Sequence, residues 1–322
     1  MDYFLIAVGF VLLIFGANYL VDGAVGIAKR FHVPDLVIGL TIVAFGTSAP
    51  ELVVNIMAAI DPDTTDLALT NIIGSNMINT FVILGATALV FPIKSQIESR
   101  RFDIPLSLAA PIVILILLWI FKDEITRTGG IILLLIFCFF MYKNIKRTTQ
   151  EQKKKKANKE ESSDDGKAQK VWLSLVMIIG GLVMLVIGGQ LIVKSATKIA
   201  AALGVSQAII GLTIVALGTS LPELATSVVA AFKKNSDIAL GNVIGSNIFN
   251  VFFVMGISAI VRPLPAYPNI NFDLAMVALG SLLVLIFVLT NKKHEIKRWE
   301  GGLLLAIYAV YLVWMINNQP IT

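Results

Sequence analysis

The stretch VIGLTIVAFGTSAPELVVNIMAAI at residues 37–60 returns as IIGLTIVALGTSLPELATSVVAAF at residues 209–232. A second pair of similar stretches follows at residues 66–90 and 237–261. Each copy of the first stretch carries one glutamate, Glu51 or Glu223, in the middle of an apolar run. A charged side chain at bilayer depth costs about 2.5–3.5 kcal/mol, so two at equivalent positions indicate a path for positive charge.

The composition is that of a protein embedded in a membrane. Apolar residues make up 57% of the chain and charged residues only 15%, which is too few for a soluble surface. We therefore expect an all-α polytopic membrane protein. Apolar stretches of spanning length, roughly 20 residues each, predict ten transmembrane helices, at 3–25, 36–60, 67–91, 104–121, 128–145, 171–193, 208–232, 238–261, 271–290 and 299–317.

The basic residues predict the orientation of these helices. If the ten spans are correct, 21 of the 26 lysines and arginines lie in loops that share one side of the membrane. By the positive-inside rule these loops are cytoplasmic, and both termini are extracellular or periplasmic. The net charge of +5 is thus interpreted as topology, without any affinity for nucleic acid. We expect a multi-pass protein of the plasma membrane or the bacterial inner membrane, surrounded by the lipid bilayer.

The polar run at residues 148–170 predicts a cytoplasmic linker between two halves of the chain. A lipid-binding polybasic switch at residues 153–156 is an alternative interpretation of this run. Residues 1–147 and 171–322 would then hold five spans each. Because five is odd, the second half enters the membrane in the opposite orientation, as an inverted repeat. Such repeats are typical of alternating-access transporters, whose sites lie near the midplane on interrupted helices.

The segments GTSAPE (46–51) and GTSLPE (218–223) predict such interruptions. Pro50 and Pro222 have no amide hydrogen, so the carbonyls of Gly46 and Gly218 lose their helical partners. Carbonyls of this kind are tolerated at membrane depth where they are buried in protein or face a cavity. They are therefore candidate oxygen ligands.

Helical spacing gathers further polar side chains near the glutamates, since residues four apart share a helix face. Four stripes result, formed by Thr47, Glu51 and Asn55, by Thr219, Glu223 and Ser227, by Asn71, Ser75 and Asn79, and by Asn242, Ser246 and Asn250. All are oxygen ligands without thiolate or imidazole, a set that suits hard cations such as Na⁺ and Ca²⁺. Polar residues in membrane helices also bond neighbouring helices, and Asn76 and Asn247 are interpreted in this way.

GTSAPE with GSNMIN (74–79), and GTSLPE with GSNIFN (245–250), resemble the two α-repeats of the sodium/calcium exchangers in the Ca²⁺/cation antiporter superfamily. The resemblance implies that Glu51 and Glu223 bind Ca²⁺ and share in Na⁺ coordination. It also implies a fuller ligand set, made of the side chains of Thr47, Ser48, Ser75, Asn79, Thr219, Ser220 and Ser246 and of the backbone carbonyls of Ala44 and Ala216.

Asn250 departs from part of this family, because many prokaryotic and potassium-dependent members carry an aspartate there. The asparagine favours exchange without a K⁺ requirement. We therefore expect an electrogenic antiporter that exchanges Na⁺ for Ca²⁺ by alternating access. The transported ions are its substrates, and we expect no cofactor and no obligate protein partner.

Three other functions are alternatives to Na⁺/Ca²⁺ exchange. Exchange of Ca²⁺, or of another divalent cation, for H⁺ stays open because two buried carboxylates can also bind protons. The proton-coupled branch, however, tends to carry a different, GN-containing first motif. A passive channel would pass current without a counter-ion. We expect no enzyme, since no histidine lies in a span to activate Ser48 or Ser220.

Overall fold

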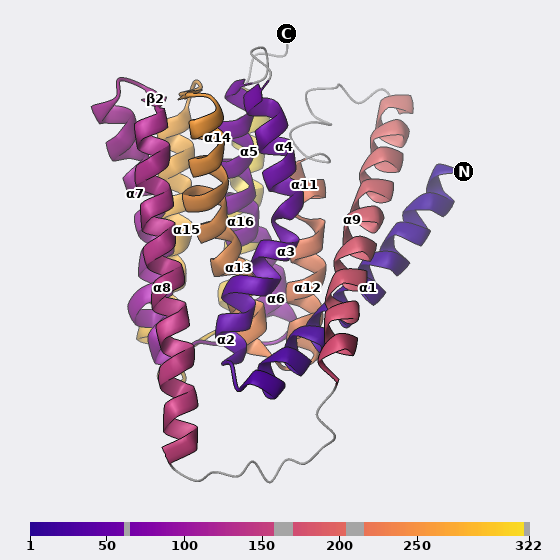
Figure 1. Cartoon of the computed structure of the whole chain (residues 1–322). Coiled ribbons are helices and arrows are strands. Elements are labelled where there is room, and N and C mark those ends of the chain that lie inside the picture. The colour runs from indigo at the N-terminus through magenta and orange to yellow at the C-terminus, as the bar shows by residue number, and fades with distance from the viewer. Residues whose placement is uncertain (61–64, 158–169, 204–215, 319–322) are drawn as a thin grey trace.

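The computed structural model describes residues 1–60, 65–157, 170–203 and 216–318. They form a bundle of long helices, in which α1 begins and α16 ends at the same end (Figure 1). Helix α8 ends and α9 begins at the opposite end. We call these two ends the termini side and the linker side.

The chain before the linker is almost entirely helical, with η marking π-helical segments. Its helices are α1 (Asp2–Phe31), α2 (Asp35–Ile38), η1 (Gly39–Val43), α3 (Ala44–Thr47), α4 (Ala49–Ile60), α5 (Thr65–Met77), η3 (Ile78–Ile83), α6 (Leu84–Val90), η4 (Ser99–Asp103), α7 (Ile104–Ile120) and α8 (Arg127–Ala157). The helices after the linker are α9 (Val171–Ala202), α11 (Ala216–Thr219), α12 (Leu221–Phe232), α13 (Ser236–Ile248), η6 (Phe249–Val254), α14 (Met255–Val261), α15 (Ile270–Thr290) and α16 (Arg298–Asn318).

Several of these helices can cross a membrane. Within the described ranges, seven are long and apolar enough, or up to eight if the bent pair Asp35–Thr47 and Ala49–Ile60 forms one span. The predicted helical membrane fold is therefore confirmed. The exact count of ten spans stays a prediction. The start of the expected span at 208–232 lies outside the described residues, and α16, at the expected span 299–317, is not among the seven helices.

Helix α8 reaches further than the sequence indicated. It continues through Ala157 and extends beyond the rest of the bundle on the linker side (Figure 1). The first part of the expected linker at 148–170 is thus helical, while residues 158–169 lie outside the described part of the chain.

Two short strand pairs tie the halves of the chain together. Strand β1 (Ile93–Lys94) pairs with β4 (Glu295–Ile296), and β2 (Glu124–Ile125) pairs with β3 (Leu264–Pro265), both antiparallel. The offset of 171 residues between the halves makes β1 equivalent to β3 and β2 equivalent to β4. Each pair therefore takes one strand from each half, and equivalent strands belong to different pairs.

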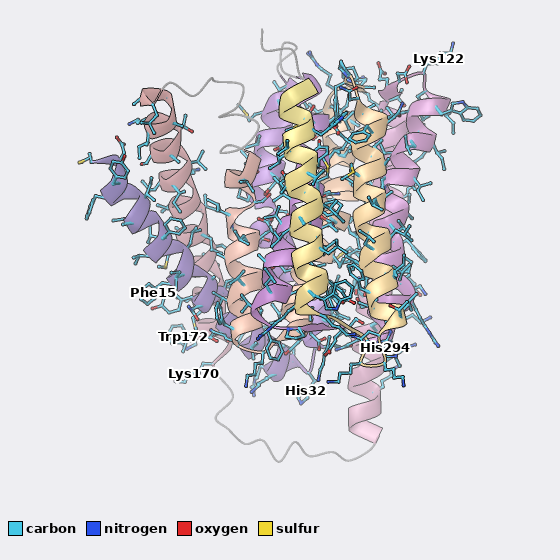
Figure 2. All side chains as sticks on the ribbon, turned by 180° about the vertical axis from the view of Figure 1, so that it is seen from behind. Phe15, His32, Lys122, Lys170, Trp172 and His294 are labelled. Atoms are coloured by element: carbon cyan, nitrogen blue, oxygen red, sulfur yellow. The ribbon has the colours of Figure 1, made fainter. Side chains whose placement is uncertain are left out.

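Equivalent loops lie at opposite ends of the bundle. Asp123 and His294, which the same offset relates, both have left-handed backbone, with φ of 64° and 53°. Lys122, next to the first of them, lies on the termini side, and His294 lies on the linker side (Figure 2). This is the arrangement expected of two repeats with opposite orientations.

Helices α1 and α9 pack backbone to backbone and lie together on one side of the bundle (Figure 1). Glycines spaced seven residues apart make this possible. A Cβ atom added to Gly9, Gly16 or Gly23 would lie 2.8, 2.8 or 2.7 Å from the carbonyl oxygen of Gly188, Gly181 or Ser174, respectively. Small residues allow this close approach of membrane helices.

The centre of the bundle is formed by the two spans that follow the glutamate segments. In the most apolar window of residues 68–90, 78% of the residues are buried, and in that of residues 236–261 the share is 83%. The corresponding shares for α1 and α9 are only 33% and 28%. The second pair of repeated stretches therefore builds the core, and α1 and α9 cover one side of it.

Candidate cation site

Both glutamate segments contain the predicted break. Helix α3 gives way to α4 at Ser48 (φ −84°, ψ 3°), and α11 gives way to α12 at Ser220 (φ −92°, ψ 5°). The two parts of the first broken span are bent by 47°. Each break lies two residues before a proline, and Pro50 and Pro222 are the second residues of α4 and α12. A proline is tolerated in the first turn of a helix because its missing N–H has no helical partner there, so the chain restarts a helix at this point and the break falls at the serine.

Glu51 and Glu223 lie in the first turns of α4 and α12, directly after the two breaks. The positive ends of the two helix dipoles favour negative charge at these positions. Each glutamate is only 1% exposed, and the two negative charges repel each other. Glu51 Oε2 and Glu223 Oε2 have no hydrogen-bond partner among the described residues. Two buried carboxylates therefore keep oxygen atoms available for a cation.

Two hydroxyl groups of the first half contact the second half. Ser48 Oγ donates to Glu223 Oε1 at 3.1 Å. Thr47 Oγ1 lies 3.1 Å from both the Val43 carbonyl oxygen and Asn242 Oδ1. The predicted site residues of the first half thus meet those of the second half inside the bundle.

The predicted residues of the second block are buried as well. Ser75, Asn79, Ser246 and Asn250 are each at most 2% exposed. Each has a side-chain oxygen without a hydrogen-bond partner in the described part of the chain. Asn79 lies in η3 and Asn250 in η6, and π-helical segments are frequent at functional sites. Contacts of α5 with α4 and of α13 with α12 bring this block beside the glutamates.

Asn76 and Asn247 are confirmed as hydrogen-bonding residues between helices. Asn76 Nδ2 donates to the Asn247 carbonyl oxygen at 3.2 Å, and Asn247 Nδ2 donates to Thr80 Oγ1 at 2.8 Å. Asn250 Nδ2 donates to Asn76 Oδ1 at 3.2 Å. The nitrogen of Asn250 is engaged in this way, while its amide oxygen has no hydrogen-bond partner among the described residues.

The remaining predicted residues differ in their surroundings. Ala44 is fully buried, and its carbonyl accepts the Ser48 N–H at 2.9 Å. Ala216 begins α11, and its side chain lies outside the described set. Ser220 is buried and Thr219 is half-buried, and neither hydroxyl has a hydrogen-bond partner among the described residues.

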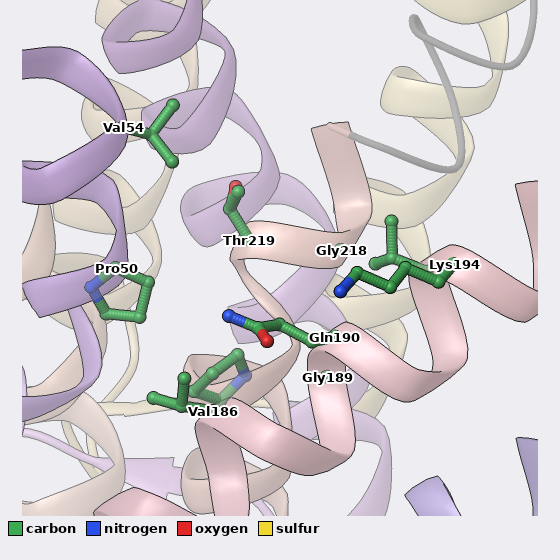
Figure 3. A pocket seen from close by; sticks show the side chains of 10 residues that line it. Pro50, Val54, Val186, Gly189, Gln190, Lys194, Gly218 and Thr219 are labelled. Carbon is green, nitrogen blue, oxygen red and sulfur yellow. The ribbon is translucent and has the colours of Figure 1, made fainter. Parts of the chain in front are cut away.

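A cavity of about 180 Å³ opens beside Thr219 (Figure 3). It lies between α9 and the two broken spans, and the side chains of Gln190 and Lys194 reach it from α9. Gln190 was not predicted from the sequence, although a polar residue inside an apolar span is a usable signal. The remaining lining residues are Pro50, Val54, Val186, Gly189, Val193, Gly218 and Pro222.

The two ends of the bundle differ, because a cavity extends toward one of them and an ion pair joins two helices toward the other. From Val186 to Lys194 the cavity follows α9 toward the C-terminal end of that helix, which lies on the termini side (Figure 1). Lys233 Nζ, at the C-terminal end of α12, lies 2.7 Å from Asp22 Oδ1 of α1. The cavity thus extends along α9 toward the termini side, while an ion pair joins α1 to α12.

The site contains two carboxylates surrounded by hydroxyl and amide oxygens. Within the residues that the structure describes, no group of three or more His, Cys, Asp and Glu side chains can hold a metal ion. Carboxylate, hydroxyl and amide oxygens are the ligands that hard cations such as Na⁺ and Ca²⁺ prefer. A helical membrane fold with two broken spans meeting at buried glutamates defines a transporter of cations.

The family follows from comparison with known proteins. The model of the family described as sodium/calcium exchanger protein matches residues 1–146 and 173–317. The chain therefore belongs to the sodium/calcium exchanger family, which consists of transporters and not of enzymes.

Individual relatives match almost the whole chain. CaxA of Alkalimonas amylolytica, provisionally named an antiporter, is 36% identical over 95% of this chain and 96% of its own length. The sodium/calcium exchanger MaX1 of Methanosarcina acetivorans is 35% identical over 97% of both chains. The solved structure of the sodium-calcium exchanger NCX_Mj superposes with a TM-score of 0.81 at 32% identity, over 98% of both chains.

Proposed function

We propose that this protein exchanges Na⁺ for Ca²⁺ across a membrane by alternating access, with Glu51 and Glu223 as its central ligands. The observation that carries the proposal is the buried pair of carboxylates, each with an oxygen that has no hydrogen-bond partner among the described residues. Two carboxylates cannot serve a divalent ion and several monovalent ions at once. Na⁺ and Ca²⁺ therefore compete for the site and move in opposite directions.

The other ligands come from both halves of the chain. They are the side chains of Thr47, Ser48, Ser75, Asn79, Thr219, Ser220, Ser246 and Asn250, and the carbonyls of Ala44 and Ala216. The side chains in this set supply oxygen atoms only, which supports Na⁺ and Ca²⁺ as substrates. The relatives that are named sodium/calcium exchangers support the same assignment.

Exchange is proposed to be electrogenic and independent of K⁺. The amide of Asn250 adds no charge to the site, so one Ca²⁺ neutralises the two glutamates. Each net elementary charge that crosses the membrane is worth about 2.3 kcal/mol per 100 mV. A negative interior therefore favours Ca²⁺ extrusion when net positive charge enters with Na⁺.

Ten spans in two inverted repeats, at residues 1–147 and 171–322, complete the proposed architecture. The linker at 148–170 is cytoplasmic, and both termini are extracellular or periplasmic. The strand pairing, in which each pair takes one strand from each half and equivalent strands belong to different pairs, supports the opposite orientation of the two halves. The distribution of basic residues supports the orientation, with the protein in the plasma membrane or the bacterial inner membrane.

Access alternates as α1 and α9 slide together over the core. Their glycine contacts favour movement as one body, and their burial is the lowest among the seven spanning helices of the described ranges, together with that of α8. The ion pair of Asp22 with Lys233 ties α1 to α12 in the arrangement described above.

Exchange of Ca²⁺ for H⁺ is the rival function, because two neighbouring carboxylates can also bind a proton. Uptake of radiolabelled Ca²⁺ into proteoliposomes separates the two functions. The vesicles are loaded with Na⁺, with K⁺, or with a buffer that imposes a pH gradient. We expect uptake only with internal Na⁺, and faster uptake when the voltage favours the exit of positive charge.

Each other outcome has a definite meaning. Uptake driven by the pH gradient without Na⁺ would identify a proton-coupled exchanger. Uptake that needs neither gradient would identify a channel. Na⁺-driven uptake that also requires K⁺ would contradict the role given to Asn250.

A further inference from the structure

Equivalent side chains in the two halves make different hydrogen bonds. Thr47 and Thr219 are equivalent by sequence, as are Asn242 and Asn71. Thr47 Oγ1 lies within hydrogen-bond distance of Asn242 Oδ1, at 3.1 Å. The equivalent bond would join Thr219 to Asn71, but it is not formed within the described ranges, where Asn71 Nδ2 has no partner and the Thr219 hydroxyl lies beside the Glu51 carboxylate.

The glutamates show the same difference. Ser48 Oγ donates to Glu223 Oε1 at 3.1 Å, whereas the equivalent Ser220 Oγ has no partner among the residues described. The first half therefore donates a hydroxyl to the carboxylate of the second half, and the reverse bond to Glu51 is not formed.

A third contact follows the same pattern. Asn242 Nδ2 donates to Ser227 Oγ at 2.9 Å and lies 3.3 Å from the Glu223 carbonyl oxygen. In the equivalent pair, Asn71 Nδ2 and Asn55 Oδ1 are both without a partner in the described part of the chain. We call the three formed contacts the Asn242 set and their three unformed equivalents the Asn71 set.

One member of the unformed set lines the cavity. Thr219 lines the cavity and is half-buried, as is Asn71. Thr47 and Asn242 of the formed set are both fully buried, at 0% exposure. The Asn242 set therefore belongs to the closed part of the site, and the Asn71 set belongs to the part that opens toward the termini side.

We propose that the two sets are exchanged in each transport cycle, with Asn71 and Asn242 as the positioning residues. This inference rests on the proposed exchange by alternating access. In the arrangement described above, Asn242 holds Thr47 and the turn that carries Glu223. When the site opens toward the linker side, Asn71 holds Thr219 and the turn that carries Glu51, and the Asn242 set opens.

The chemistry of asparagine suits this role. Its amide accepts through the oxygen and donates through the nitrogen, so one side chain holds a hydroxyl and a second helix at once. Neither asparagine needs to touch the ion. Since one set is formed in each state, the two states keep the same number of these bonds. Their free energies then stay close, which exchange in both directions requires.

The accessibility of the cavity tests the proposal. In a Cys138→Ser background, Gln190→Cys places a thiol in the cavity, where a membrane-impermeant maleimide reaches it from the termini side. Losing a net hydrogen bond of about 1 kcal/mol changes an equilibrium about fivefold. The labelling rate follows the population of the state that is open to the termini side, so we expect Asn242→Ala to slow the labelling about threefold to fivefold. Adding Asn71→Ala should return the rate to within about twofold of the parent, because both states then lose their bonds.

Recovery of the labelling rate in the double variant distinguishes the exchange of contacts from a general loss of folding, which a second substitution would not repair. The proposal is overturned if the double variant labels as slowly as Asn242→Ala, or if Asn71→Ala alone also slows labelling. Ser227→Ala removes one partner of Asn242, tests the same set without changing either asparagine, and should slow labelling as well. Thr226→Ala is the matched control, since its buried hydroxyl bonds only Pro222 of its own helix, at 2.7 Å.

Labelling does not depend on which cation is transported, so the inference and the proposed function can fail separately. Na⁺-driven Ca²⁺ uptake is measured on the same Gln190→Cys parent. If uptake does not need Na⁺ but the labelling rate of the double variant returns to that of the parent, the exchange of contacts is supported and the proposed Na⁺/Ca²⁺ exchange is contradicted. If uptake needs Na⁺ and the labelling rate of the double variant stays low, only the exchange of contacts is contradicted.

Discussion

Glu51 and Glu223 are the residues on which transport is expected to depend most strongly. Replacing either with glutamine keeps the side-chain shape but removes one buried charge that a cation needs. Removing one partner of a buried charge pair costs about 3–5 kcal/mol, which corresponds to more than about 100-fold in affinity. Na⁺-driven Ca²⁺ uptake should therefore fall below detection in Glu51→Gln and in Glu223→Gln.

A buried glutamate outside the site supplies the control. Glu300 is 4% exposed and accepts the Lys297 N–H at 2.7 Å, a bond that glutamine can also accept. Glu300→Gln should keep uptake near the parental rate. Substantial uptake by either site variant would remove the central role of the glutamates.

Asn76 is expected to control affinity through Asn250. In Asn76→Ala the amide of Asn250 loses the acceptor that fixes its orientation, at a cost of about 1 kcal/mol. The Ca²⁺ concentration for half-maximal uptake should rise about fivefold, with a smaller change in the maximal rate. Thr87→Ala is the control, because the buried Thr87 hydroxyl bonds only the Ile83 carbonyl oxygen, four residues earlier in the same span. An unchanged half-maximal concentration would contradict the role of Asn76.

The sequence predicted which residues form the site, but it did not predict which of them are hydrogen-bonded to each other. Helical spacing and the repeat placed the glutamates, hydroxyls and amides on common faces, and the structure buries most of them together. The pairing of Thr47 with Asn242 could not be predicted. Such a bond depends on how two distant helices approach each other, and spacing along one helix does not report that distance.

At the scale of the helices, the contact between α1 and α9 allows a sharp comparison. A Cβ atom on Gly181 would lie 2.6 Å from the Gly16 carbonyl oxygen, whereas one on the adjacent Gly180 would meet nothing within 4 Å. Gly181→Val should therefore force the helices apart and lower the free energy of unfolding by about 1–3 kcal/mol.

Thermal unfolding in detergent and Ca²⁺ uptake measure this effect. Gly181→Val should lower the unfolding temperature and slow the uptake, while Gly180→Val should leave both near the parental values. Equal effects of the two substitutions would mean that the close approach of α1 and α9 does not matter.

The sequence indicated the breaks in the helices but not their π-helical segments. Proline and glycine are visible signals for an interruption, and both broken spans contain them. Segments η3 and η6 carry no comparable signal, since the apolar pattern of a membrane helix hardly changes when one turn widens.

For the whole molecule, the opposite orientation of the halves predicts opposite accessibility of equivalent loops. In the Cys138→Ser background, a thiol at Lys122→Cys should react with an impermeant reagent added outside the cell. A thiol at His294→Cys should react only after the inner side is exposed. Reaction of both thiols from the same side would contradict the inverted arrangement.

The membrane architecture was largely predictable because composition and apolar length determine which segments can span a bilayer. The extension of α8 to Ala157 was not predicted, because its polar sequence has the composition of a flexible linker. The strand pairs were also missed, since two-residue strands such as β1 and β4 are defined by partners from the other half.

The crossed strand pairs have a consequence for biosynthesis. Domains generally fold in the order in which the ribosome makes them. Here, however, β1 and β2 are made long before β4 and β3 exist to pair with them. The two strands of the first half therefore stay without these partners until the second half has been made, and both strand pairs form late in biosynthesis.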